Sequence, residues 1–269
     1  MSNAEYLLGA NQSEFERLQF QHGVWKSNTN AFFDRLGVAK GWNCLDVGAG
    51  PGFVSFDLRD RVGESGSVTA LEPSSLFLDW FSEQVKLKKW TNVHLINGTA
   101  EEAKLPSQQY DLIFARWVIA FVPEPDKFFK QLLSALKPNG IIAFQDYYYE
   151  GLSLFPHGGA FDRMADMVRA YYHTSGGDPY ITGKIPAWFR QNNLQTIDYS
   201  PHLYAGGPES PITEWAHRFF STHIQHMVDK QVMKQSEGDA MLADWLEHRK
   251  NPDALFFSPM VVDVAGRKL

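Results

Sequence analysis

The chain has 269 residues, of which 44% are hydrophobic and 21% are charged, and this balance excludes a disordered or collagen-like protein. A net charge of -6 without a basic run disfavours a nucleic-acid partner. The single cysteine, Cys44, excludes an intramolecular disulfide and a cysteine-ligated zinc or iron-sulfur cluster. Eight of the ten tyrosines lie between Tyr147 and Tyr204, so the second half differs from the first in its polar-tipped rings.

The chain shows no membrane or export segment by sequence. No stretch reaches the roughly 18 apolar residues of a membrane span. Residues 1–16 lack the basic region and the apolar run of a secretory signal. These observations predict a cytoplasmic protein.

The first half alternates short apolar runs with amphipathic segments, a pattern typical of β-α-β units and a parallel sheet. It begins with one or two helices within residues 12–37. Five strands are then predicted, at 43–47, 67–71, 93–96, 111–115 and 141–146. Amphipathic helices are predicted at 75–89 and 125–137, and the second of them ends at a Lys-Pro-Asn-Gly stop signal.

The second half is mainly helical, with joints rich in glycine and proline. Helices are predicted at 160–175, 185–193, 212–232 and 238–249. Two further strands, at 195–204 and 256–265, would bring the sheet to seven. The simplest organisation is one α/β domain whose late crossovers carry helical insertions over one face.

A glycine-rich motif follows the first predicted strand: Asp46-Val47-Gly48-Ala49-Gly50-Pro51-Gly52. Glycines there allow a tight turn and close approach of a ligand to the backbone. The spacing G-x-G-x-G differs from the G-x-G-x-x-G of dinucleotide-binding proteins. Glu72 ends the second strand, where an acid can accept both hydroxyls of a ribose. An ordinary strand-to-helix turn and a helix cap at Glu72-Pro73 are the alternatives.

With both features, the sequence resembles the class I S-adenosylmethionine (SAM)-dependent methyltransferases, and among them the small-molecule enzymes related to the ubiquinone/menaquinone-biosynthesis group. The resemblance covers residues 10–150 well and 180–269 weakly. It implies a Rossmann-like, seven-stranded, mostly parallel sheet with helices on both faces and a helical cap. It implies SAM as cofactor and S-adenosylhomocysteine (SAH) as product. The cofactor-binding residues that it implies are Gln21, Asp46, Gly48, Ala49, Gly50, Gly52, Glu72, Pro73, Thr99, Ala100, Arg116 and Trp117.

The resemblance also divides the single domain into parts. Residues 1–40 would form helices that cover the cofactor, and residues 41–150 would bind it. The cap would comprise 151–180 and 207–253, and 254–269 would be the final strand.

Several of these residues have simpler interpretations. Arg116 could pair with Asp111 or Glu124 instead of touching a ligand, and Gln21 could be a solvated helix residue. His217, His223 and His226 fall on one predicted helix, but no carboxylate completes a metal site, so packing or substrate contact is preferred. Cys44 reads as a small buried hydrophobe.

The chemistry of SAM is an in-line displacement at the sulfonium methyl, so a base is needed only if the nucleophile must lose a proton. The candidates for a catalytic role are Tyr147, at the end of the fifth strand, and His157 in the following joint. The predicted acceptor is an O, N or C nucleophile on a small molecule, aromatic or apolar to suit the tyrosine-rich half.

Two alternative functions stay open, a catalytically silent SAM-binding protein and an NAD(P)-dependent oxidoreductase. The role of the tyrosines has a direct test in the structure. If Tyr147, Tyr149, Tyr171 and Tyr172 line a cavity beside the glycine loop, the enrichment concerns the acceptor; if all point away, it concerns packing.

Overall fold

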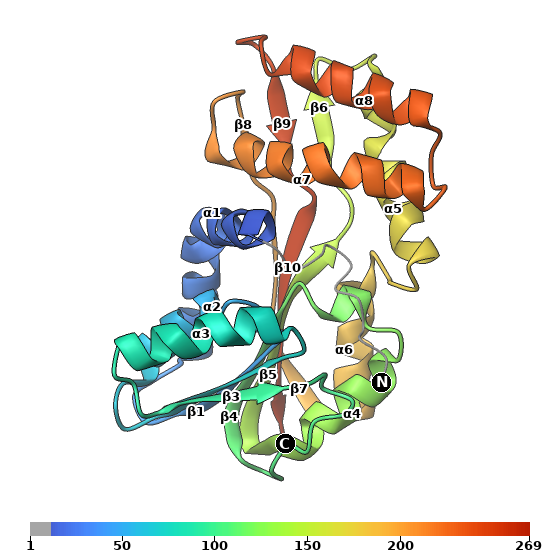
Figure 1. Ribbon diagram of the computed structural model, residues 1–269. Helices are drawn as coiled ribbons and strands as arrows, with labels where there is room; N and C mark the ends of the chain where they lie inside the picture. The colour runs from blue at the N-terminus through green and yellow to red at the C-terminus, as the bar shows by residue number, and fades with distance from the viewer. Residues whose placement is uncertain (1–11) are drawn as a thin grey trace.

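A computed structural model describes residues 12–269 and shows an α/β fold around a seven-stranded sheet (Figure 1). The prediction about a signal segment, made on residues 1–16, therefore falls mostly outside the described residues. The strand order is β3-β2-β1-β4-β5-β10-β7, and β10 runs antiparallel to both of its neighbours. The sheet consists of β1 (Asn43–Val47), β2 (Ser67–Glu72), β3 (Val93–Asn97), β4 (Tyr110–Arg116), β5 (Leu136–Tyr148), β7 (Leu194–His202) and β10 (Met260–Lys268). The predicted Rossmann-like fold class is confirmed.

Helices cover both faces of this sheet (Figure 1). The helices are α1 (Gln12–Leu36), α2 (Phe53–Val62), α3 (Ser75–Leu87), α4 (Pro125–Ala135), α5 (Met164–Thr174), α6 (Ile181–Gln191), α7 (Pro211–Asp229) and α8 (Gln235–His248), with short 3-10 turns η1 (Ile119–Phe121) and η2 (Ala160–Arg163). Alternation along the strands sorts the core between the faces. In β4, Leu112 and Phe114 pack with α1 and α2, whereas Ile113 and Ala115 join the core that contains Phe129 of α4. The five inner strands β2, β1, β4, β5 and β10 are buried on both faces over most of their length, which explains their apolar runs, whereas the edge strands β3 and β7 are partly exposed.

The C-terminal half departs from the predicted elements at its last strands. The predicted strand at 256–265 is two strands, β9 (Leu255–Phe257) and β10, separated by Ser258-Pro259. Proline has no N–H to give to a sheet ladder, which accounts for the break. β9 pairs with β6 (Ser153–Phe155) and β8 (Ala205–Gly206) in a small second sheet that the sequence did not predict.

Helix boundaries also shift. The helix predicted at 125–137 ends at Ala135, because β5 begins at Leu136. The segment predicted as one helix at 160–175 divides into η2 and α5. α6 begins four residues before the predicted start, with Pro186 inside it.

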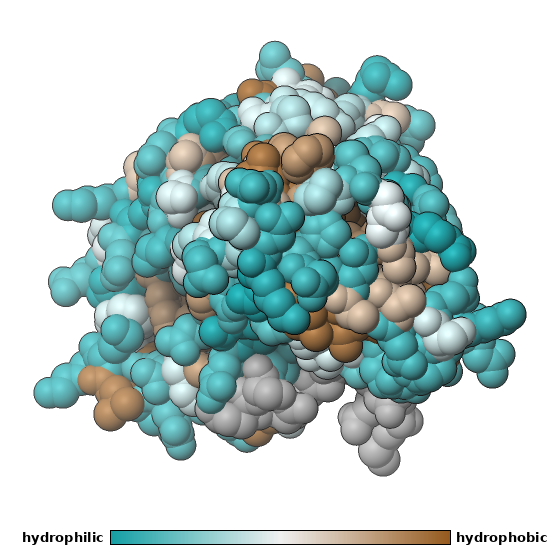
Figure 2. Space-filling view, turned by 90° about the horizontal axis from the view of Figure 1, so that it is seen from above, coloured by the Kyte–Doolittle hydropathy of each residue, from teal (hydrophilic) through white to brown (hydrophobic). Residues whose placement is uncertain are grey.

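The small sheet and helices α5, α7 and α8 lie together beyond one end of the main sheet, at the top of Figure 1. We call this group the cap. α1 reaches it and packs against α7. Viewed from the cap side, most of the surface is hydrophilic, with hydrophobic atoms showing in patches between polar side chains (Figure 2). Within residues 12–269, no helix is both long and apolar enough to cross a membrane.

Candidate active site

A cavity of about 810 Å³ lies between the sheet and the cap. Its walls come from α1, the glycine loop, the ends of β2, β4 and β5, and helices α5 and α7. Open α/β sheets bind ligands outside the carboxyl ends of their strands, and the cavity occupies that position. Its volume suits a nucleoside-sized ligand together with a second small molecule.

The glycine loop takes left-handed backbone conformations that favour glycine. Gly48 has φ +66°, and a Cβ there would lie 2.4 Å from a methyl of Val118. Gly50 has φ +55°, and a Cβ there would meet nothing within 4 Å, because Gly50 borders the cavity. The N–H groups of Gly48 and Ala49 both donate to Leu71 O, at 2.8 and 3.1 Å. The loop is thereby fixed to the end of β2 with one face open to a ligand.

Gly52 does not occupy its predicted place. It caps the start of α2 with φ +87°, and a Cβ there would lie 2.3 Å from the ring of Phe81. It is absent from the cavity wall. Gly52 therefore allows α2 to pack against α3, and the prediction that it contacts the cofactor is not supported by its position.

Two buried carboxylates stand at the loop. Asp46 accepts a 2.6 Å hydrogen bond from Ser55 Oγ, and burial raises its pKa to about 7. Glu72 accepts from Gly50 N and Ser74 N, both at 2.8 Å, and burial raises its pKa as well. Both line the cavity, and so do Pro73, Thr99 and Ala100 further along the same wall.

Arg116 ends β4 and lines the cavity. Its guanidinium donates to Thr29 Oγ1 at 2.9 Å and lies 3.1 Å from His22 Nδ1. The pairings considered from sequence do not form: Asp111 bonds Lys137, and Glu124 bonds Lys127. Burial, together with Arg116 and Lys26, lowers the pKa of His22 to about 3. His22 is therefore neutral and can accept from Arg116.

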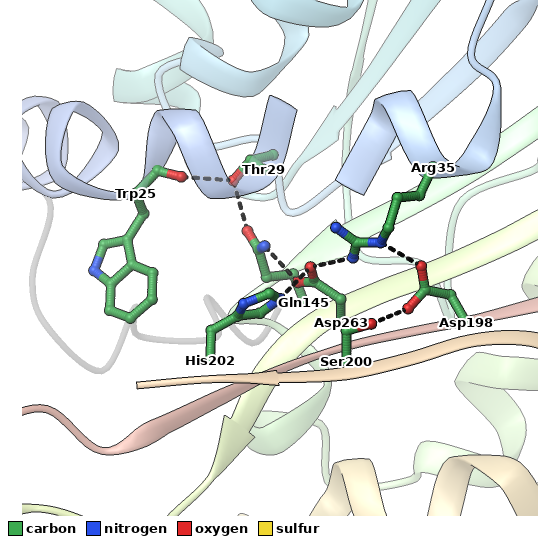
Figure 3. A network of polar contacts seen from close by, with 8 residues as sticks. All are labelled: Trp25, Thr29, Arg35, Gln145, Asp198, Ser200, His202 and Asp263. Atoms are coloured by element: carbon green, nitrogen blue, oxygen red, sulfur yellow. Dashed lines mark hydrogen bonds and ion pairs between the residues drawn. The ribbon is translucent and has the colours of Figure 1, made fainter. Parts of the chain in front are cut away.

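Thr29, which accepts from Arg116, belongs to a longer chain of hydrogen bonds that is shown in Figure 3. The Thr29 hydroxyl donates to Gln145 Oε1 at 2.6 Å, and Gln145 Nε2 donates to Asp263 Oδ1 at 2.6 Å. Asp263 is fully buried, and its Oδ2 lies 2.8 Å from both Arg35 and His202. Because the Asp263 carboxylate accepts hydrogen bonds, the Gln145 amide turns its nitrogen towards Asp263 and its oxygen towards Thr29. The Thr29 hydroxyl therefore donates to Gln145 and can accept from Arg116.

Trp117 follows directly and is strained. It has φ +56°, which is uncommon for a bulky residue. Its N–H donates to Gln145 O at 2.9 Å, and its ring stacks near Tyr147 with centroids 6.1 Å apart. Backbone strain of this kind concentrates at functional sites.

Gln21 joins the N-terminal helix to the cap. Its Oε1 accepts from Arg17 Nη1 and from Trp215 Nε1, both at 2.9 Å. All three residues line the cavity. Gln21 is buried, so it is not the solvated helix residue considered as an alternative.

The tyrosine test has a clear outcome. Tyr147, Tyr149, Tyr171 and Tyr172 all line the cavity. The other four tyrosines of the second half do not: Tyr148, Tyr180, Tyr199 and Tyr204 lie outside its wall. The enrichment therefore serves the cavity in part and packing in part.

His157 does not reach the cavity. Its side chain is 64% exposed and pairs with Asp162 at 3.3 Å. A catalytic role for it is not supported, because a catalytic group must lie within reach of the reacting atoms. Of the three histidines on α7, only His223 lines the cavity. Among residues 12–269 no three histidine, cysteine or acidic groups come together as a metal site.

On α7, sequence reasoning considered only the three histidines for substrate contact and missed the other residues of the wall that this helix contributes. Its members are spaced three or four residues apart along one helix face: Trp215, Ala216, Phe219, Phe220, His223 and Met227. This spacing is visible in the sequence, but it is the same for a helix face packed in a core. Only the cavity distinguishes the two cases.

Comparison with known proteins decides the family. A family model described as a methyltransferase domain matches residues 39–193, more than half of the chain. The chain belongs to this methyltransferase domain family. Demethylmenaquinone methyltransferase of Bacillus licheniformis is 30% identical over 207 residues, which cover 72% of this chain and 86% of the relative. The predicted membership in the class I SAM-dependent methyltransferases is confirmed.

Other methyltransferase relatives match over shorter lengths. The enzyme of Listeria welshimeri, also a demethylmenaquinone methyltransferase, is 31% identical over 125 residues, which cover 46% of this chain and 52% of the relative. In that match the chain spans about half the length of the curated relative. A crystal structure of a putative methyltransferase from Bacillus halodurans shares the fold, with a TM-score of 0.60 and 15% identity over 88% of this chain and 98% of that one.

Proposed function

We propose that the protein transfers a methyl group from SAM to an O, N or C nucleophile on an uncharged small molecule with aromatic or apolar surface. One observation carries the proposal. The glycine loop with Glu72 and the tyrosine-rich wall border the same cavity, so a cofactor and an acceptor can meet in it. Both relatives are demethylmenaquinone methyltransferases by name, and a quinone acceptor is compatible with the aromatic wall.

The residues of the wall fit SAM. Glu72 would accept the ribose hydroxyls, and the open face of Gly50 leaves room for the ligand against the backbone. Thr99 and Ala100 would border the adenine. The amide nitrogen of Gln21 would donate to the carboxylate of the methionine part, since Gln21 Oε1 is already engaged by two donors. Arg116 would add positive charge at the same end.

The bound cofactor would supply a methyl group activated on a sulfonium. The chain's own contribution is to orient and enclose: a nucleophile held about 3 Å from the methyl, in line with the breaking bond, gains roughly 7 to 11 kcal/mol from positioning. Tyr147 lies next to Trp117 and would face both ligands, so it is the residue that we expect to touch the acceptor. Apolar side chains of α5 and α7 would exclude water.

Ligand binding and turnover test this proposal separately. Thermal unfolding should shift upward with SAM and with SAH but not with NAD or NADP, since a ligand that binds only the folded state stabilises it. Methyl transfer from radiolabelled SAM to a panel of phenols, quinols and aromatic amines should then identify an acceptor. No stabilisation by either sulfur nucleoside would overturn the proposal. Stabilisation without transfer to any acceptor would favour a silent SAM-binding protein instead.

A further inference from the structure

The cavity changes character along its length. Its charged lining residues are Arg17, Asp46, Glu72, Glu101 and Arg116, and all belong to α1 or to the cofactor-binding part. The lining contributed by α5 and α7 holds no acidic or basic side chain other than the imidazole of His223. An acceptor against this wall would therefore be recognised by shape and by neutral hydrogen bonds.

His223 is the polar group of α7 in this wall, and its protonation pattern follows from its contacts. The side chain is 1% exposed. Its Nδ1 lies 2.8 Å from Phe219 O, and the ring stacks on that of Phe219 with centroids 3.8 Å apart. A carbonyl oxygen can only accept, so Nδ1 carries the hydrogen and Nε2 carries the lone pair. Burial and the positive charge of Arg17 lower the His223 pKa to about 3, which keeps the imidazole neutral.

The lone pair on Nε2 is not used by any residue between 12 and 269. Among the residues that the structure describes, none donates a hydrogen bond to His223 Nε2. Buried polar atoms are nearly always paired, because an unpaired acceptor loses its bonds to water without replacement. A ligand that brings an O–H or N–H to this wall would restore the lost bond, whereas one without a donor would not.

We propose that His223 Nε2 is the hydrogen-bond acceptor that selects an acceptor molecule bearing a hydroxyl or N–H group. The proposal rests on the proposed function, because it places the acceptor in the cap side of the same cavity. It makes His223 a specificity-determining residue, one that binds and orients the acceptor through a neutral hydrogen bond.

His226 supplies a matched control. It lies one turn further along α7, and its ring meets that of His223 edge to face at 5.5 Å. Its Nδ1 is also buried without a partner among the described residues, yet the residue does not line the cavity. The two histidines therefore share the helix, the residue type and a buried nitrogen without a described partner. They differ in access to the cavity, and His226 as a whole is only partly buried.

The test uses phenol and anisole, which share one ring and differ in the donor. Dissociation constants of both are measured by calorimetry on the full chain with saturating SAH, and again without SAH, for wild type, His223→Phe and His226→Phe. The wild type should bind phenol about tenfold more tightly than anisole. His223→Phe should reduce this ratio to about one, and His226→Phe should keep it.

A second readout needs no variant. In wild-type protein labelled with nitrogen-15 at histidine, the His223 Nε2 resonance should move upfield on addition of phenol and stay in place with anisole. The proposal would be overturned if folded His223→Phe kept the wild-type ratio of phenol to anisole affinity. It would also be overturned if the Nε2 resonance did not shift with phenol, or if phenol did not bind at millimolar concentration. Failure of SAH to bind while the phenol preference persists would overturn the methyltransferase function and leave the role of His223 standing.

Discussion

The two walls of the cavity are built on different principles. The wall of the glycine loop is polar and held rigidly: Glu72 is tied to two backbone N–H groups, and Arg116 is held by Thr29 and His22. The wall of the cap is aromatic and almost without fixed polar contacts. The first wall suits a ligand with charged ends and several hydroxyls, and the second suits a neutral ring.

The difference also shows in what supports each wall. The loop stands on the parallel sheet, where β1 and β2 are buried on both faces over most of their length. The cap wall stands on helices that pack through rings, such as Phe161 against Phe220 and Trp245 at about 5 Å. A scaffold of this kind can change its lining without disturbing the sheet. We therefore expect substitutions in the first wall to affect SAM and those in the second to affect the acceptor.

The largest expected effect comes from Glu72→Ala. The change removes a carboxylate that organises the loop and that would accept both ribose hydroxyls, so SAH affinity should fall about a hundredfold, as expected for the loss of two charged hydrogen bonds. Calorimetric titration with SAH measures it. Glu102→Ala is the matched control, because Glu102 is exposed and outside the cavity wall. If Glu72→Ala lowered SAH affinity less than threefold, the result would contradict the assignment of SAM binding to the wall of the glycine loop.

A smaller effect is expected from Thr29→Val, which keeps the side-chain shape and deletes the hydroxyl between Arg116 and Gln145. Thr29 is fully buried. Leaving both partners unsatisfied should lower the free energy of unfolding by about 2 kcal/mol and weaken SAH binding about tenfold. Urea denaturation and SAH titration measure the two effects. Thr182→Val, which removes another fully buried hydroxyl that bonds Tyr147 O, should cost stability and leave SAH affinity unchanged.

The pH dependence of stability offers a third test. In the folded protein the His223 pKa is about 3, against 6.5 for free histidine. Below pH 6.5 the imidazole of His223 is protonated in the unfolded chain but stays neutral in the folded chain. The free energy of unfolding therefore decreases as the pH falls from 6.5 towards 3. Between pH 7.5 and 5.5 the loss amounts to about 1.4 kcal/mol. His223→Phe should lack it.

The measurement is the difference in unfolding free energy between wild type and His223→Phe at the two pH values. Asp46 and Asp146, whose pKa values burial raises to about 7, act in the opposite direction. Their contributions are common to both proteins and cancel in the difference. A difference that stays constant with pH would contradict the buried, neutral state of His223.

The smallest expected effect belongs to His157→Ala. The residue is exposed and outside the cavity, so kcat/KM for an identified acceptor should stay within twofold of wild type. Tyr147→Phe, in contrast, should lower it about tenfold if its hydroxyl contacts the acceptor. A steady-state assay compares the two variants, and a large loss in His157→Ala would show that the cap wall extends beyond the cavity described.

The sequence predicted the first half of the fold well. The strands up to β5 appear within a few residues of their expected bounds, apart from the early start of β5, and the loop between β1 and α2 lies at a ligand cavity. These features depend on local information: apolar runs that match the period of a buried strand, and glycines whose φ values other residues rarely adopt. Glu72 follows from the same logic, since the end of a strand places its side chain at the edge of the sheet.

What the sequence left open depends on contacts between distant segments. Gly52 looks like its two neighbours in the motif, but Phe81 of another helix decides that it serves packing. His157 and His223 are both histidines of the cap half, and only the assembled fold leaves one exposed and buries the other against the cavity. The sequence by itself determined the sheet and the cofactor loop, because the sheet follows from the local pattern of apolar residues and the loop follows from the backbone conformations that glycine favours. The tertiary structure alone decided which rings and imidazoles face the acceptor, because a helix face lined with aromatics packs equally well against a core or around a cavity.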